Sequence, residues 1–185
     1  MTSTYQPNLS HCGIFCRDLG SMKSFYGGVF DLIETDRGRG VTFNFEIIFL
    51  SGRGDQHHQL VLAGGRSADS ASTVMQLSFK VLDLEQLREA RRRALAMGAT
   101  GMRGLNHGNA MSLYCQDPEG NTVEIYLDTP WYVSQPHGDP LDLDQDDATL
   151  WAETERIVRT DPSYMLASDW AAQFTQRRLA QAARG

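Results

Sequence analysis

The stretch DPEGNTVEIY, residues 117–126, decides how this chain is expected to fold. Its first four residues predict a tight turn, because proline fixes one backbone dihedral and glycine accepts a positive φ. The run 122–127 then predicts a β-strand whose residues 123, 125 and 127 share an apolar face. Glu124 lies on the opposite face, where a carboxylate needs either solvent or a partner. An outward-facing Glu124 and a metal-binding Glu124 both fit this alternation.

Length, charge and hydropathy narrow the class of protein. The chain has 185 residues, enough for one domain of good size, and a formal net charge of −6. An acidic chain lacks the basic surface that nucleic-acid-binding proteins need, so we expect no nucleic-acid partner. No apolar run approaches the roughly 20 residues that cross a bilayer, and the N-terminal stretch lacks the features of a signal peptide. We therefore expect a cytoplasmic protein with no membrane partner.

The same order of expected elements occurs twice along the chain. A strand, a helix and three strands are expected over 9–17, 21–30, 32–36, 41–50 and 58–63, and again over 73–81, 84–97, 100–103, 110–116 and 122–127. Asp18 and Asp83 stand at the same point of the two repeats, each as the N-cap of the helix. This duplication predicts an α+β fold of two tandem βαβββ modules, residues 8–63 and 73–128.

Residues 129–185 do not continue the repeat. A Pro-rich segment is followed by an acidic stretch and then by two expected helices, over 147–159 and 161–181. The second helix is expected to begin at Asp161-Pro162, an N-cap followed by proline at the first helical position. Trp151, Trp170 and Phe174 indicate that these helices pack on the domain or on a second subunit.

Polar residues recur at corresponding positions of the two repeats. When the second repeat is shifted onto the first, Gln76 falls on His11 and Glu124 falls on His58. All four lie within otherwise apolar strands, and they converge on one cavity if the modules pair into one concave sheet. Imidazole and carboxylate together are typical ligands of iron, manganese, nickel or zinc. We therefore expect a divalent-metal site here, rather than a hydrogen-bonded core histidine at His11.

In these residues the chain resembles the vicinal oxygen chelate superfamily, which includes glyoxalase I, bleomycin-resistance proteins, fosfomycin-resistance enzymes and type I extradiol dioxygenases. The resemblance covers about residues 8–128 and depends on His11, the helix after Asp18 and the strand that carries Glu124. It is closest to the single-domain extradiol dioxygenases, whose signature H-G-x-x-x-S-x-Y is similar to HGNAMSLY, residues 107–114. The resemblance implies a vicinal-oxygen-chelate domain over 8–128, with a helical C-terminal extension over 129–185.

The resemblance also implies the metal ligands. His11 and Glu124 match the first histidine and the glutamate of a two-His, one-carboxylate iron site, and Gln76 stands where the second histidine is usual. A neutral amide oxygen is a weaker donor than imidazole. Gln76 is then a ligand, as in some glyoxalase I enzymes, or His58 completes the set and leaves His107 as the base, or metal binds weakly or not at all. Fe(II) is the implied metal, with Mn(II), Ni(II) and Zn(II) as alternatives.

Three further residues match the family's catalytic groups. His58 matches the acid–base histidine beside the metal, a position that supplies a ligand in the glyoxalase branch. His107 and Tyr114 match groups that hold substrate and the oxygen-derived intermediate. The implied function is extradiol-type ring cleavage of a catechol-like aromatic diol with O2. The alternatives are a glyoxalase-type isomerase or lyase with a divalent metal, and a metal-free small-molecule-binding protein of the resistance type. The family pairs its modules within or between chains, and the short connector favours a homodimer.

Overall fold

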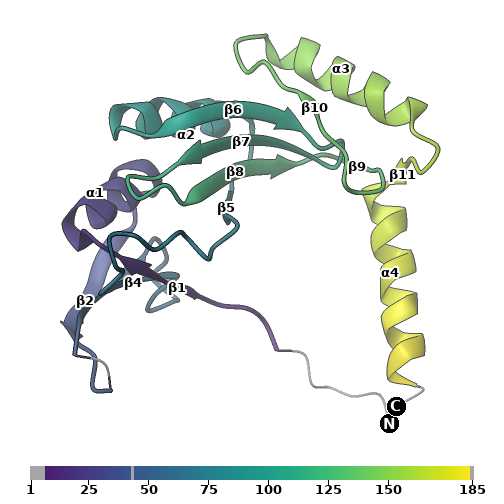
Figure 1. Ribbon diagram of the computed structural model, residues 1–185. Helices are drawn as coiled ribbons and strands as arrows, with labels where there is room; N and C mark the ends of the chain where they lie inside the picture. Colours follow the sequence, from purple (N-terminus) through teal and green to yellow (C-terminus); the bar gives the residue numbers. More distant parts are fainter. Residues whose placement is uncertain (1–6, 43, 184–185) are drawn as a thin grey trace.

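The first module forms a four-stranded sheet with one helix. A computed structural model describes residues 7–42 and 44–183 (Figure 1). The elements of this module are β1 (Cys12–Cys16), α1 (Leu19–Phe30), β2 (Ile33–Arg39), β3 (Glu46–Ser51) and β4 (Leu60–Gly64). The strand order is β1-β4-β3-β2, and β1 runs parallel to β4. The strand expected from residue 41 begins only at Glu46, where pairing with β2 and β4 becomes continuous.

The second module repeats this arrangement. Its elements are β5 (Leu77–Lys80), α2 (Leu84–Ala96), β6 (Thr100–Asn106), β7 (Ala110–Gln116) and β8 (Thr122–Asp128). The strand order is β5-β8-β7-β6, again with the first strand parallel to the fourth, and β10 (Asp139–Pro140) adds to the outer edge of β6. The βαβββ duplication predicted from the sequence is therefore confirmed, although β5 is shorter and β6 longer than expected.

The helix caps and the strand alternation behave as the sequence indicates. Asp18 accepts hydrogen bonds from the backbone N–H groups of Gly20 and Ser21, and Asp83 accepts one from Gln86. The apolar residues of β8, at 123, 125 and 127, are all buried. This alternation leaves Glu124 on the face of the sheet turned away from that core.

The turn at residues 117–120 joins the two modules. The Tyr26 hydroxyl on α1 donates to Asp117 Oδ2 over 2.9 Å. Glu119 Oε1 accepts from the backbone N–H groups of Arg17 and Asp18, at 2.5 and 2.8 Å. Helices α1 and α2 also pack against each other. The sheets themselves remain separate, and β1 and β5 each form an edge of their own sheet. Within one chain the modules therefore do not pair into one concave sheet.

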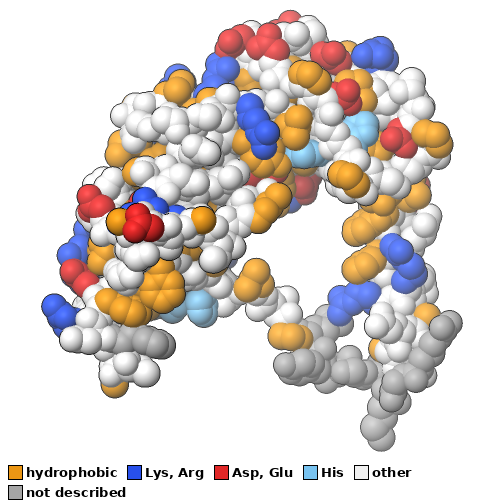
Figure 2. Space-filling model, viewed as in Figure 1, with side chains coloured by type: hydrophobic (Ala, Val, Ile, Leu, Met, Phe, Trp, Pro, Cys, Tyr) orange, Lys and Arg blue, Asp and Glu red, His pale blue; other side chains and the backbone are white. Residues whose placement is uncertain are grey.

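The first part of the C-terminal extension packs on the second module, and its last helix projects away from that module. It consists of β9 (Trp131–Tyr132), β10, α3 (Asp147–Thr160), β11 (Met165–Leu166) and α4 (Ala167–Ala182). Trp131, Val133 and Val158 form a small core of their own. Helix α4 projects away from the sheets (Figure 1) and lies beside an open hollow in the space-filling view (Figure 2), and none of its described residues is buried. Among the described residues, no helix has the length and apolar character needed to cross a membrane.

The start of the last helix was predicted wrongly. Asp161 and Pro162 do not begin it, because the Asp161 carboxylate instead accepts the backbone N–H of Ser163 within a turn. Residues 165 and 166 then pair with β9, and α4 begins at Ala167. Trp170 stacks on Tyr132 with ring centroids 5.3 Å apart. Tertiary pairing with β9 thus takes precedence over a local helix-start signal.

Candidate functional site

A pocket of about 260 Å³ opens on the second module. Strands β7 and β8, the residue that directly precedes β5, the loop after β6 and the C-terminal extension all contribute to its wall. The lining residues are Gln76, His107, Asn109, Ala110, Tyr114, Glu124, Tyr126 and Gln135. Four of the six residues predicted as site residues therefore meet around one pocket.

Glu124 is the centre of this pocket. Its side chain is buried, with the residue only 8% exposed, and its carboxylate is held by neutral donors from both neighbouring strands. Oε1 accepts from the Tyr114 hydroxyl at 2.6 Å, while Oε2 accepts from Ser78 Oγ at 2.6 Å and from Gln76 Nε2 at 2.7 Å. The register explains these contacts, because Ser78 and Tyr114 are the direct partners of Glu124 across the two ladders.

His107 extends this network to the C-terminal extension. Its Nδ1 lies 2.7 Å from the backbone oxygen of His137, and its Nε2 lies 2.8 Å from the Tyr114 hydroxyl. A carbonyl oxygen only accepts, so Nδ1 carries hydrogen, and Nε2 of the neutral ring is an acceptor. Burial and the hydrogen bond to Glu124 raise the pKa of Tyr114, so this hydroxyl keeps its proton at neutral pH.

Tyr114 therefore has one hydrogen and two acceptors. Glu124 Oε1 and His107 Nε2 both face its oxygen at hydrogen-bond distance. A single hydroxyl hydrogen serves only one of them. A cation bound at Glu124 would take up a carboxylate lone pair and leave the Tyr114 hydrogen to His107. This hydrogen count, together with a buried carboxylate whose contacts at hydrogen-bond distance all come from neutral groups, fits a metal at Glu124.

The remaining two predicted residues form a separate group on the first module. His11 directly precedes β1 and His58 precedes β4, and these strands are paired neighbours. The two imidazole rings lie 4.3 Å apart between centroids. His58 Nδ1 lies 2.9 Å from His57 Nδ1, and the other nitrogen of His57 lies 3.2 Å from Asp36. Burial, with His11 and His57 nearby, lowers the pKa of His58 and favours the neutral ring that binds metals.

The two groups do not meet within one chain. Neither His11 nor His58 lines the pocket that contains Glu124. Among the residues that the structure describes, no three His, Cys, Asp or Glu side chains are grouped so that they could hold a metal ion. Histidines occupy both sides of the hollow in Figure 2. One copy of the chain thus presents two incomplete halves of the expected site.

Two residues that contact the predicted site residues were not predicted. Ser78 on β5 comes two positions after Gln76, which directly precedes that strand, so the period of an extended chain places both side chains on one face and makes Ser78 predictable. Gln135 lies in the irregular segment after β9, and its side-chain nitrogen donates to the backbone oxygen of His107 over 2.9 Å. No sequence pattern connects Gln135 to the loop of His107.

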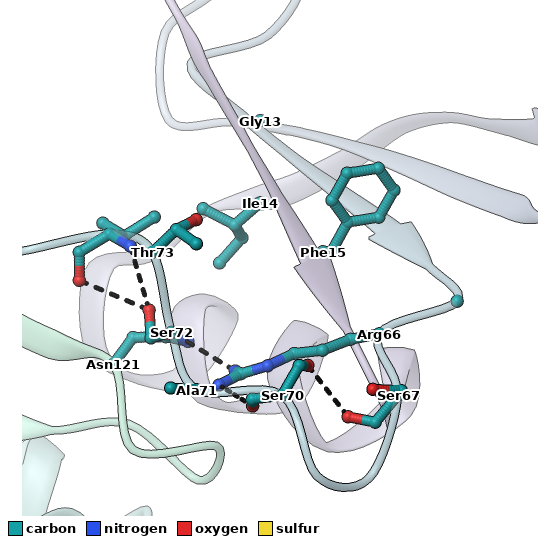
Figure 3. Close-up of a pocket in the computed structure, with 12 residues that line it drawn as sticks. Gly13, Ile14, Phe15, Arg66, Ser67, Ser70, Ala71, Ser72, Thr73 and Asn121 are labelled. Atoms are coloured by element: carbon teal, nitrogen blue, oxygen red, sulfur yellow. Dashed lines mark hydrogen bonds between the residues drawn. The ribbon is translucent and has the colours of Figure 1, made fainter.

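A second pocket, of about 380 Å³, lies between the modules (Figure 3). It is lined by β1 residues 13–15, by the connector and by Asn121. Arg66 extends along its floor and donates to Glu119, Ser70 and Asn121 over 3.2, 3.1 and 3.4 Å. The side chains of Arg66 and Glu119 are only 7% and 5% exposed. The hydrogen bonds of the guanidinium are thus made within the protein. Arg66 and Glu119 therefore connect the two modules, and we do not take the pocket as a second candidate site.

Comparison with known proteins identifies the family. The model of the glyoxalase/bleomycin resistance protein/dioxygenase superfamily matches residues 8–125. A search of curated proteins gave no match. Among solved structures, the fosfomycin resistance protein FosX of Listeria monocytogenes, complexed with Mn(II) and sulfate, is 21% identical with a TM-score of 0.53, over 68% of this chain and 95% of that one.

Two further solved structures are similar to the chain. FosX of Mesorhizobium loti is 23% identical over 66% of this chain and 92% of that one, with a TM-score of 0.51. A glyoxylase/bleomycin resistance protein/dioxygenase domain from Frankia sp. EAN1pec is 24% identical over 68% of this chain and all of that one, with a TM-score of 0.50. At these identities the likeness establishes the fold.

Proposed function

Because this chain belongs to the glyoxalase/bleomycin resistance protein/dioxygenase superfamily, we propose that it is a divalent-metal enzyme whose site is completed between two copies of the chain. The half on the second module holds Gln76 and Glu124, and the half on the first module holds His11 and His58. In one chain these halves are separate, and within residues 7–42 and 44–183 β1 and β5 are each the last strand at one edge of their sheet. A second copy would join the edges and bring one half of each kind together, twice in a symmetric dimer.

The ligands we propose are Glu124 and Gln76 of one copy and His11 of the other. The amide nitrogen of Gln76 donates to Glu124 and to Ser78, so the amide oxygen is the atom of Gln76 offered to a metal. Gln76 contacts Oε2 of Glu124, and the other carboxylate oxygen, Oε1, faces the Tyr114 hydroxyl. Fe(II) suits this mixed imidazole and oxygen set, and Mn(II), Ni(II) and Zn(II) are the alternatives.

The reaction we propose is extradiol-type cleavage of a catechol-like diol with O2. One observation carries this choice: the first and last residues of HGNAMSLY meet, with His107 Nε2 2.8 Å from the Tyr114 hydroxyl, beside the carboxylate of Glu124. Bound metal would hold both reactants at one centre and withdraw charge from the diol oxygens. Of these two residues, Tyr114 carries the hydrogen that faces the pocket, and its hydroxyl would turn that hydrogen toward negative charge that develops on the substrate, while the unprotonated Nε2 of His107 stays an acceptor.

His58 of the second copy is the proposed base. Its Nδ1 already faces His57, so Nε2 is the atom that would take a proton from a diol hydroxyl and return it later. The lowered pKa keeps this ring neutral and ready to accept a proton at neutral pH. His58 thus moves the proton, while His107 and Tyr114 orient the substrate.

A second candidate is a glyoxalase-type isomerase or lyase. The observation that favours it is Gln76, a neutral ligand that suits proton transfer next to a metal and replaces the histidine usual in the dioxygenases. Such chemistry needs no position for oxygen. The Mn(II) bound by the Listeria protein agrees with this candidate as well as with a dioxygenase.

The test combines metal analysis with subunit mixing. Protein purified without oxygen or chelator is expected to contain near-stoichiometric metal, and His11→Ala and Glu124→Ala are each expected to lose it. Mixing the two variants under conditions that exchange subunits should restore about a quarter of the sites, since half of the dimers are mixed and each has one intact site. Glu46→Ala, an exposed carboxylate of β3, is the control.

The outcomes separate the candidates. Iron with oxygen uptake on catechols supports ring cleavage, whereas metal without oxygen uptake supports the isomerase or lyase. Variants that show no recovery on mixing contradict a site shared between copies, as does a monomer by light scattering at micromolar concentration. Wild-type protein that takes up no metal after reconstitution contradicts the metal enzyme and leaves a small-molecule-binding role.

A further inference from the structure

We infer that the C-terminal extension is a working part of the site, because Gln135 and the backbone of His137 fix the ring orientation and the tautomer of His107. The extension follows the segment that the family model matches, which ends at residue 125. The positioning is independent of any metal. Its importance for the reaction rests on the proposed function, in which Nε2 of His107 must face Tyr114.

The first set of contacts holds the ring. The backbone oxygen of His137 accepts the hydrogen of His107 Nδ1 over 2.7 Å. Gln135 Oε1 accepts the backbone N–H of His137 over 3.1 Å, and Gln135 Nε2 donates to the backbone oxygen of His107 over 2.9 Å. Gln135 therefore links the residue that carries the ring to the residue that specifies its tautomer. The same nitrogen also lies 3.2 Å from Asn109 Oδ1.

The second set of contacts holds the loop that carries His107. Gly108 has a φ of 74°, and a Cβ at this position would lie 2.5 Å from Val133 and 3.0 Å from Val158, so the extension packs directly on its backbone. Thr129 Oγ1 donates to the Gly108 oxygen over 2.6 Å. Asn106 accepts the Gly108 N–H and donates to Thr154 on α3. Extension residues thus enclose the loop.

The physical consequence is a histidine with one defined donor and one defined acceptor. The hydrogen bond made by one ring nitrogen decides which nitrogen is protonated. With Nδ1 committed to the His137 carbonyl, Nε2 is the atom presented to Tyr114 and to the pocket. Without this carbonyl, the ring can turn over and exchange its two nitrogens, which would put a donor where the site has an acceptor. Gln135 is therefore a positioning residue, acting through His107.

The test is the tautomer of His107 in the full-length protein. Two-bond ¹H–¹⁵N correlation spectra, recorded on the metal-free and zinc-loaded forms at a pH where the ring is neutral, distinguish Nδ1–H from Nε2–H. We expect only Nδ1–H in the wild type and in Gln145→Ala, a glutamine of the same extension outside this pocket. Gln135→Ala and Gln135→Glu should both show a mixture of tautomers. Gln135→Glu retains the acceptor for His137 while removing both donors, so it serves if the alanine variant folds poorly.

Catalysis gives a second readout. We expect Gln135→Glu to lower kcat by about tenfold or more with KM little changed, as for other partners that orient a catalytic group. A wild type with Nε2–H, or a Gln135→Glu variant with the Nδ1–H tautomer unchanged, overturns the inference. The spectra need no substrate, so the two proposals can fail separately. A protein that shows no oxygen uptake but keeps the Nδ1–H tautomer would refute the proposed reaction and still support the positioning.

Discussion

The hydroxyl oxygen of Tyr114 lies 2.6 Å from Oε1 of Glu124, at directly opposed positions of β7 and β8. A hydrogen-bonded pair of this kind lets one strand set the position of a carboxylate on the next. The same hydroxyl oxygen also lies at hydrogen-bond distance from His107 Nε2, so Tyr114 connects the proposed ligand Glu124 to His107.

Tyr114→Phe is expected to separate metal binding from catalysis. The variant keeps the ring but removes the hydroxyl and the one hydrogen bond that its hydrogen makes, which contributes about 1 kcal/mol to stability. Glu124 retains its contacts with Ser78 and Gln76. We therefore expect metal content near that of the wild type and a kcat about 100-fold lower. Tyr132→Phe, on the face that stacks with Trp170, is the matched control. Unchanged turnover in Tyr114→Phe would contradict the role of this hydroxyl.

Gln76→His is expected to strengthen metal binding. Imidazole is a better donor than an amide oxygen, so affinity for Fe(II) or Mn(II) should rise by about tenfold, provided that Ser78 continues to hold Glu124. Competition with a fluorescent chelator measures this change. Gln116→His, an exposed residue at the end of β7, is the control. Equal or weaker affinity in Gln76→His would show that residue 76 does not reach the metal.

Arg66→Met should destabilise the joint between modules. It leaves the Glu119 carboxylate buried without its cation, a change that typically costs on the order of 3 kcal/mol. Adding Glu119→Gln should recover part of the loss, because the uncompensated charge is removed. Arg53→Met breaks a pair that is exposed on both sides and should cost much less stability, because solvent screens both charges. Urea denaturation of the four proteins measures these values, and equal losses for Arg66→Met and Arg53→Met would refute the joint.

Stability should fall at alkaline pH because of two buried thiols. Burial raises the pKa of Cys16 to about 12 and that of Cys115 to about 11, from 9.0 in the unfolded chain. At a pH between the unfolded-state pKa and the folded-state pKa of each thiol, the unfolded chain releases a proton that the folded protein retains. The free energy of unfolding therefore decreases as pH rises from 9. Cys115→Ala should flatten this slope. The measurement is denaturant unfolding at intervals from pH 8 to 11, and an identical slope in the variant would contradict it.

Local signals predicted the fold well. Asp18 and Asp83 were recognised as N-caps because capping depends on a few adjacent residues. The alternation in β8 likewise placed Glu124 opposite the apolar face of the strand. The start of α4 was predicted wrongly, since the signal at Asp161 is local whereas the pairing of residues 165–166 with β9 is tertiary.

The candidate site was predictable only within each module. Gln76, Tyr114 and Glu124 meet because the period of a strand and the register of a ladder follow from the sequence pattern. The separation of His11 from Glu124 depends on how two sheets are placed, and no short pattern encodes this. The support that Gln135 gives to His107 arises from an irregular segment, where side-chain direction has no period to read.

The contact between Glu119 and the start of α1 also determines when the first module is finished. The carboxylate that receives the Arg17 N–H lies 102 residues further along the chain. Contacts between residues so distant in sequence form slowly, because the loop between them must close first. During synthesis from the N-terminus, the first module lacks these bonds until residue 119 has emerged. The repeats are therefore sequential in the sequence but are completed together in folding.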